Sequence, residues 1–297
     1  MDTSTQVALD KILNATSPVH VFKNIENGWK DEYKYYVGLV HPDKCDHPRA
    51  HEAVSKLNKY KQELERGIDI TDESGTGRYF VKQLILKDTD YRLREVSFNN
   101  YRTLMDLKSE ASKELKKYLP ENMEFQKDML TISFRNRAIP LSSLETLPQE
   151  HVNWVLSRMI EFVGYMSMEG YVHAGINPDS IFIMPESHGL VCTSFYHMVR
   201  KGTRLQTVSG KWKSFYPEMT FSKKRAVPAI DLELAKRTAV WLAGDKRGCG
   251  TILRKTHNEE LVDFLMKFDS EPYLCFTNYR RLLSKHFDTS KFIPLNI

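Results

Sequence analysis

Pro42 lies between two helical patterns near the start of the sequence, and it limits how this part can fold. Before it, apolar and aromatic residues recur at three- and four-residue steps from residue 21 to about residue 40. After it, a second amphipathic pattern begins near Pro48 and ends at Gly67. Because proline cannot continue a helix, the two patterns predict an antiparallel helical hairpin. A shorter amphipathic segment, residues 7–13, is expected to lie against the pair.

The connection between the two helices carries an imidazole and a carboxylate on a tight, proline-held turn, which presents both groups to a partner. The segment KDEYKYYVGLVHPDK resembles the second helix and the HPD signature of J domains. That family stimulates ATP hydrolysis by DnaK-type chaperones, so the resemblance implies a chaperone-binding surface. The residues that it implies are His41, Pro42, Asp43 and Lys44 of the loop, with Lys34 and Lys30 of the preceding helix.

Two other interpretations of this region stay open. The hairpin could be purely structural, with the HPD triplet forming only a turn. Alternatively, a metal ion could be bound, because borderline metals favour imidazole and thiolate ligands. The side chains available for such a site are His41, Cys45, His47 and His51, although their spacing matches no usual zinc pattern.

Residues 68–77, IDITDESGTG, are polar with two glycines and mark a change in character. We therefore predict a domain boundary here. With 297 residues and 41% hydrophobic content, the chain can form two cores. The expected domains are a J domain at 1–67 and a second domain at 68–297.

The second domain starts with an apolar run, RYFVKQLILK, that favours a strand. A charged helix over 90–107 and a strand pair within 123–134 are expected next. A long buried helix is predicted from 152 to 168, and mostly helix after 229. The expected fold class is α+β, with an all-α hairpin domain followed by a small mixed lobe and a larger helical lobe.

The stretch GYVHAGINPDSIFIMPESHGLVCTSFY resembles the catalytic and metal-binding loops of protein kinases, H-R-D-x-x-x-x-N followed by D-F-G. Aligned on His173 and Pro178, Gly175 stands at the catalytic aspartate, Ser180 at the metal-binding asparagine and Ser194 at the D-F-G aspartate. Phosphoryl transfer needs a carboxylate to accept the hydroxyl proton and an Asp and an Asn to hold magnesium. The resemblance therefore implies a kinase-like domain without kinase catalysis.

The resemblance covers about residues 68–290. Lys82 resembles the lysine of the third kinase strand, and Glu95 is placed to be its partner on helix αC. Tyr216-Pro217-Glu218 resembles the A-P-E element, and Asp231 resembles the aspartate of helix F. Lys82 and Glu95 could hold a nucleotide or form a structural ion pair, and both alternatives stay open.

Gly75-Thr76-Gly77 has the spacing of glycines that cradle phosphates, but it lies only five residues before Lys82. This leaves no room for the two strands that flank a true phosphate-binding loop, so we expect none here.

From Val199 to Ala226 the sequence has eight basic residues against Glu218 alone, whereas the net charge of the whole chain is +5. Lys and Arg near aromatic residues suit an acidic protein, a phosphorylated partner or single-stranded nucleic acid. A solvated loop is the alternative. The candidate partner-binding residues are Arg200, Lys201, Arg204, Lys211, Lys213, Lys223, Lys224 and Arg225.

The favoured function is a J-domain co-chaperone that stimulates a DnaK-type chaperone and recruits a client or assembly partner through an inactive kinase-like domain. The alternatives are an atypical nucleotide-binding transferase, and a scaffold or nucleic-acid-binding protein that uses residues 199–226. We expect no catalytic residue, no cofactor and no bound metal. The four cysteines are scattered, and no apolar run is long enough to span a membrane, so a cytoplasmic protein without a membrane partner is expected.

Overall fold

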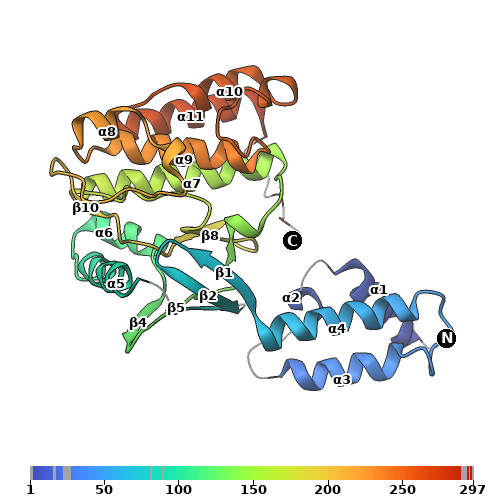
Figure 1. Ribbon diagram of the computed structural model, residues 1–297. Coiled ribbons are helices and arrows are strands. Elements are labelled where there is room, and N and C mark those ends of the chain that lie inside the picture. The colour runs from blue at the N-terminus through green and yellow to red at the C-terminus, as the bar shows by residue number, and fades with distance from the viewer. Residues whose placement is uncertain are drawn as a thin grey trace. The chain divides into compact units, whose positions relative to one another are not determined.

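A computed structural model describes residues 3–15, 18–22, 28–80, 82–87, 90–288, 293 and 295 (Figure 1). The chain divides into two compact units. The first contains Met1–Ile70 and Arg78–Gln83, and the second contains Thr71–Gly77 and Leu84–Leu295. Three strands, β1 (Ile68–Asp72), β2 (Gly75–Phe80) and β3 (Gln83–Lys87), therefore each contain residues of both units.

The first unit is a set of helices around one apolar core. Leu9, Trp29 and Leu57 are among the buried residues of this core. Two hydrogen bonds fasten the end of the first helix: the Tyr60 hydroxyl donates to the Ala15 carbonyl over 2.8 Å, and Lys56 donates to the carbonyl of Leu13. The helices are α1 (Thr3–Asn14), α2 (Pro18–Val21), α3 (Trp29–Val40) and α4 (Ala50–Arg66).

Helices α3 and α4 lie side by side as an antiparallel pair (Figure 1). The Tyr33 hydroxyl, near the start of α3, donates to Oδ1 of Asn58 over 2.6 Å. The Lys61 ammonium lies 5.2 Å from the centre of the Tyr33 ring. Both partners belong to the second half of α4, as an antiparallel arrangement requires. Helix α4 is followed by its C-cap, Gly67, which has a φ of +70° that residues with a side chain rarely adopt.

The helix before Pro42 is shorter than the sequence pattern predicts. It was expected from residue 21, but Val21 ends α2 and α3 begins at Trp29. Part of the expected helix, residues 23–27, lies outside the described residues. Gly28 occupies the N-cap position of α3, and glycine is a poor residue for a helix interior. The predicted segment 7–13 is contained in the longer helix α1.

A five-stranded sheet has the order β1-β2-β3-β5-β4. Its last two strands pair antiparallel, with Met123 opposite Ile132 and Phe125 opposite Leu130. This confirms the predicted strand pair within 123–134. The strands are β1 (Ile68–Asp72), β2 (Gly75–Phe80), β3 (Gln83–Lys87), β4 (Asn122–Gln126) and β5 (Met129–Ser133).

The polar segment 68–77 forms β1, a two-residue turn and the start of β2, so the expectation that strands had no room beside its glycines is wrong. The run 78–87, predicted as one strand, contains the end of β2 and all of β3. A Cβ on Gly77 would lie 2.4 Å from the backbone oxygen of Ile85. Gly77 therefore serves the close approach of two strands.

The remainder of the second unit is mainly helical. Asp90 caps the first of these helices, since its carboxylate accepts the amide hydrogens of Arg92 and Leu93. The helices are α5 (Tyr91–Met105), α6 (Glu110–Leu115), α7 (Gln149–Met168), α8 (Met219–Lys223), α9 (Pro228–Leu242), α10 (Glu259–Met266) and α11 (Pro272–His286). The 3₁₀ helices are η1 (Lys116–Tyr118), η2 (Leu141–Ser143), η3 (Lys213–Phe215) and η4 (Leu253–Lys255).

Five short strands complete the unit, and they bring the loops between α7 and α9 together. Three of them form a sheet in the order β6-β8-β9, and β10 pairs with β7. They are β6 (Ile139–Pro140), β7 (Tyr171–Val172), β8 (Ile181–Met184), β9 (Gly189–Cys192) and β10 (Val199–Arg200).

Helices α7, α9 and α11 pack against one another in the helical part of the second unit (Figure 1). Helix α9 is buried along most of its length. Its fully buried Lys236 donates to the backbone oxygens of Phe264 and Lys267. The second unit is thus a mixed α/β arrangement, with a sheet part and a helical part. None of the helices in the described ranges has the length and apolar character needed to cross a membrane.

Leu57 tests the core of the first unit. It is fully buried on α4, so Leu57→Ala should destabilise this unit by about 2–5 kcal/mol through lost burial and a cavity. Val7→Ala on α1 is the control, because Val7 is 62% exposed and its loss should change stability by less than about 0.5 kcal/mol. Urea unfolding measures both, and equal effects would contradict the packing described.

Candidate functional site

The HPD corner, which we define as His41 to Lys44, is a tight turn at the end of α3. The His41 amide donates to the Val37 carbonyl over 3.0 Å and so closes the helix. The His41 carbonyl then accepts the amide hydrogens of Lys44 and Cys45, at 2.8 and 2.9 Å. Cys45 is buried in the helical core and anchors the turn.

The side chains of the HPD corner are open to solvent. The His41 side chain is 42% exposed and that of Asp43 is 84% exposed. Nδ1 of His41 accepts the Asp43 amide hydrogen over 3.3 Å, which orients the ring. The first unit thus presents an imidazole and a carboxylate beside each other.

The predicted basic residues near the corner are exposed as well. Lys30 and Lys34 lie four residues apart on α3, and His41 follows Lys34 by seven residues, so the three share one helix face. Lys34 lies 3.7 Å from Asp31, but both side chains are highly exposed and such pairs contribute little. Lys44 is exposed on the corner itself. The first unit therefore has a basic face that continues into the HPD corner.

The metal-binding alternative finds no support in this geometry. Cys45 packs in the core, whereas His51 is exposed on α4. Across the described ranges, no three His, Cys, Asp or Glu side chains are grouped in a way that could hold a metal ion.

In the second unit, a buried carboxylate on α9 holds the loop that resembles the kinase catalytic loop. The two oxygens of Asp231 accept the amide hydrogens of His173 and Ala174, each over 2.7 Å. Ala174 has a φ of +54°, and the Tyr216 hydroxyl donates to its carbonyl over 2.6 Å. Burial raises the pKa of Asp231 to about 7, although the two amide hydrogen bonds act against this shift. The loop backbone is therefore fixed from both sides.

His173 is a structural residue of this loop. Its ring is fully buried, and Nε2 lies 3.0 Å from Sγ of Cys192. Burial lowers the pKa of His173 to about 3, so the ring is neutral at physiological pH.

Gly175, which the resemblance aligns with the catalytic aspartate, has no space for a side chain. A Cβ built on it would lie 2.9 Å from Cδ2 of His197. His197 is itself buried and held at both ring nitrogens, by Thr207 at 2.7 Å and by Glu73 at 3.0 Å. The volume that a catalytic side chain would need is thus filled.

Ser180 and Ser194 use their hydroxyls inside the unit. Oγ of Ser180 donates to the Gly175 carbonyl over 2.8 Å, where it fastens the loop. Oγ of Ser194 donates to Asp72 over 3.3 Å. Burial raises the pKa of Asp72 above its usual value. Neither serine offers the anionic oxygen that binds magnesium strongly.

The turn between β1 and β2 places a carboxylate beside this loop, at Glu73. Glu73 accepts hydrogen bonds from the Ser209 hydroxyl and, over 3.2 Å, from the Lys211 amide, in addition to its contact with His197. Burial acts to raise the pKa of Glu73, but the hydrogen bonds with His197 and Ser209 outweigh it and hold the pKa below its usual value. An anion thus lies next to the loop that begins at His173.

Two residues that the kinase resemblance selects lie elsewhere than predicted. Lys82 lies in the turn before β3, not on a strand. Glu95 is exposed on α5, and its neighbour Arg94 is the buried residue. Arg94 donates to the Ser74 carbonyl over 2.9 Å. Glu95, predicted as the partner of Lys82 on this helix, is thus exposed, and Arg94 is the residue that the helix turns inward.

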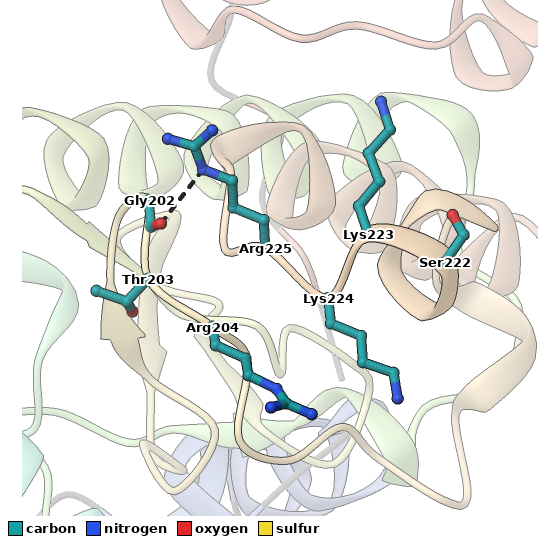
Figure 2. A pocket seen from close by; sticks show the side chains of 7 residues that line it. All are labelled: Gly202, Thr203, Arg204, Ser222, Lys223, Lys224 and Arg225. Carbon is teal, nitrogen blue, oxygen red and sulfur yellow. Dashed lines mark hydrogen bonds between the residues drawn. The ribbon is translucent and has the colours of Figure 1, made fainter.

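The basic segment 199–226 separates into two groups of residues. In the first group, each cation already has a contact within the unit: Arg200 lies over the Tyr171 ring, Lys201 donates to Ser167, Lys211 pairs with Asp179 and Lys213 lies over the Phe221 ring. The second group lines one hollow at the surface (Figure 2) and consists of Arg204, Lys223, Lys224 and Arg225.

Asp179, Glu73 and His197 are the important residues that sequence reasoning missed. Asp179 is buried, and its Oδ2 accepts hydrogen bonds from Lys211 at 2.6 Å and from the Trp212 indole at 2.7 Å. Asp179 lies in the segment that resembles the kinase catalytic loop. A carboxylate there, with a basic and aromatic segment later in the sequence, could have suggested an ion pair between them. Glu73 and His197 are far apart in the sequence, and no local pattern connects them.

No protein-family model matches the sequence, and no curated protein matches it. Among solved structures, one described as "Structure of vaccinia related kinase 3" is similar, with a TM-score of 0.48 and 14% sequence identity. The match covers 74% of this chain and 90% of that chain.

Gly175 tests whether the loop can accept a side chain. Gly175→Ala should lower stability by about 1–3 kcal/mol, because the new methyl group meets His197. Gly210→Ala is the matched control, since nothing lies within 4 Å of a Cβ there. Thermal unfolding compares the two variants. A Gly175→Ala protein as stable as the control would show that the loop is open.

The burial of His173 should make the free energy of unfolding depend on pH. Its pKa is 6.5 in an unfolded chain and about 3 here, so the unfolded state binds more protons between these values and stability falls as the pH drops below 6.5. Asp231 has the opposite effect on stability between pH 3.8 and about pH 7, because its pKa is raised in the folded state. The contribution of His173 is therefore isolated by comparing the protein with a His173 variant. The stability of the protein relative to His173→Gln should fall by about 1.4 kcal/mol per pH unit below 6.5. Urea unfolding at several pH values measures this difference, and parallel pH curves would refute a buried neutral ring.

Proposed function

We propose that the chain is a J-domain co-chaperone that stimulates the ATPase of a DnaK-type chaperone. The observation that carries this proposal is the exposed HPD corner, with His41 and Asp43 side by side at the end of α3, the helix that also exposes Lys30 and Lys34. A chaperone surface with acidic groups can be approached by Lys30, Lys34 and Lys44 together. The corner itself is held rigidly by backbone hydrogen bonds, which lowers the entropy cost of binding.

The second unit is proposed to be an inactive kinase-like domain that recruits a client or an assembly partner. Gly175, Ser180 and Ser194 stand where phosphoryl transfer needs a base and two metal ligands. The Glu73 carboxylate beside the loop would repel phosphates. These features argue against the nucleotide-binding transferase.

Joining the two activities in one chain gives the recruiting domain a physical role. A partner bound to the second unit is held close to any chaperone that the HPD corner engages, so the second encounter becomes intramolecular and its effective concentration rises. All four cysteines are free thiols, which suits a reducing compartment such as the cytoplasm, where we propose that the protein acts.

The direct test is single-turnover ATP hydrolysis by a purified DnaK-type chaperone, with and without the full chain. We expect the chain to accelerate hydrolysis and His41→Gln to return it to the basal rate, because glutamine cannot reproduce the imidazole contacts. His47→Gln is the matched control in the same connection and should leave the acceleration intact. Equal acceleration by the His41 variant would refute the proposed role of the HPD corner.

A further inference from the structure

Two neighbouring hollows lie on the basic segment of the second unit. The first, of about 390 Å³, is lined by residues 202–204 and 222–225 (Figure 2). The second, of about 370 Å³, is lined by residues 204–208 with Thr220, Phe221 and Lys224. Arg204 and Lys224 line both hollows, so the two form one continuous surface with a pair of cations at its centre.

The cations of this surface are available to a ligand. Within the described part of the chain, none of Arg204, Lys223, Lys224 and Arg225 forms an ion pair, and all four are exposed. The only hydrogen bond drawn between the lining residues of the first hollow joins Nε of Arg225 to the Gly202 carbonyl, at 3.2 Å. Arg204 and Lys224 extend their side chains toward the same side (Figure 2). Together they form an unneutralised positive site.

The backbone fixes the position of this pair. Lys224 has a φ of +51°, a left-handed conformation that is unfavourable for a residue with a side chain. Its carbonyl accepts the Leu205 amide hydrogen over 2.9 Å, and Ala226 and Thr203 are joined by a further backbone hydrogen bond of 2.8 Å. The two strands of chain that carry Arg204 and Lys224 are thus tied together, and the strained lysine is retained beside the arginine.

The second hollow offers a different chemistry next to the cations. Leu205, Val208 and Phe221 give it apolar walls. Thr220 also lines it, and this residue is only 2% exposed. Its hydroxyl oxygen is itself buried and has no hydrogen-bond partner among the described residues.

We propose that this surface binds a phosphorylated serine or threonine of a partner protein, with the phosphate between Arg204 and Lys224 and a neighbouring apolar side chain in the second hollow. A phosphate carries close to two negative charges and three acceptor oxygens, which suits an arginine and a lysine held side by side. The inference deepens the recruiting part of the proposed function and rests on it, because it states what kind of partner the second unit selects.

Single-stranded nucleic acid fits this surface less well. Such ligands need exposed aromatic rings on which bases stack. Of the four aromatic residues of the segment, Trp212, Phe215 and Tyr216 are buried, and Phe221 alone lines the hollow. A single ring offers little surface for stacked bases, whereas the cations suit a compact anion.

The test measures binding of the full chain to a library of fluorescein-labelled peptides with phosphoserine fixed beside leucine. We expect binding that is lost with the unphosphorylated peptides and weakened about tenfold or more by the double variant Arg204→Gln, Lys224→Gln. The double variant Arg200→Gln, Lys201→Gln removes the same charges outside the hollow and should bind normally. Thermal unfolding must show that both variants are folded.

Three results would overturn the proposal. One is the absence of binding to every phosphopeptide at concentrations up to about 1 mM. Another is equal binding by the Arg204 and Lys224 variant. The third is tighter binding of a single-stranded RNA 12-mer with a steep salt dependence that this variant abolishes, which would assign the surface to nucleic acid. No chaperone is present in these assays, so their failure is distinct from a failure of the HPD corner.

Discussion

The Asp231 carboxylate lies inside the second unit and accepts two amide hydrogens from the loop that begins at His173. This interaction fixes the backbone of Ala174 in its left-handed conformation and so sets the course of the residues that follow. The positions of Gly175 and Ser180, and the space that His197 fills, depend on that course. A loop built in this manner keeps its geometry without any bound ligand, because its polar groups are satisfied from within the unit.

The same loop region has a consistent charge pattern. Ser180 and Ser194 contribute neutral hydroxyls, and the Glu73 carboxylate beside them is held by His197 and Ser209. Lys211 is paired with Asp179. Arg204 and Lys224, which line the surface hollow, have no ion pair within the described residues. These charges support the proposal that the second unit binds an anionic partner at this surface.

Short-range sequence patterns predicted the helices, turns and strands that depend on neighbouring residues in the sequence. Pro42 and the apolar periodicity located the turn and the helix now seen as α4, and the run of residues 123–134 indicated the strand pair β4 and β5. The substitutions at Gly175, Ser180 and Ser194 were visible in a motif of fixed spacing. The sequence could not show that His197 meets Glu73, because 124 residues separate them and only the fold joins them. Lys82 was expected on a strand because the short turn that contains it lies inside an apolar run and leaves no clear signal.

The central claim is that the HPD corner is the active surface of this chain and that the kinase-like loop is chemically silent. Hydrogen–deuterium exchange of the full chain tests both parts in one experiment, with the chain alone, with magnesium and ATP, and with an ATP-bound DnaK-type chaperone. The account predicts new protection of α3 and of the amides that follow His41 only when the chaperone is present, and no change at residues 72–75 or 173–180 with nucleotide alone. Protection of these two segments by magnesium and ATP, with none at the corner, would contradict it.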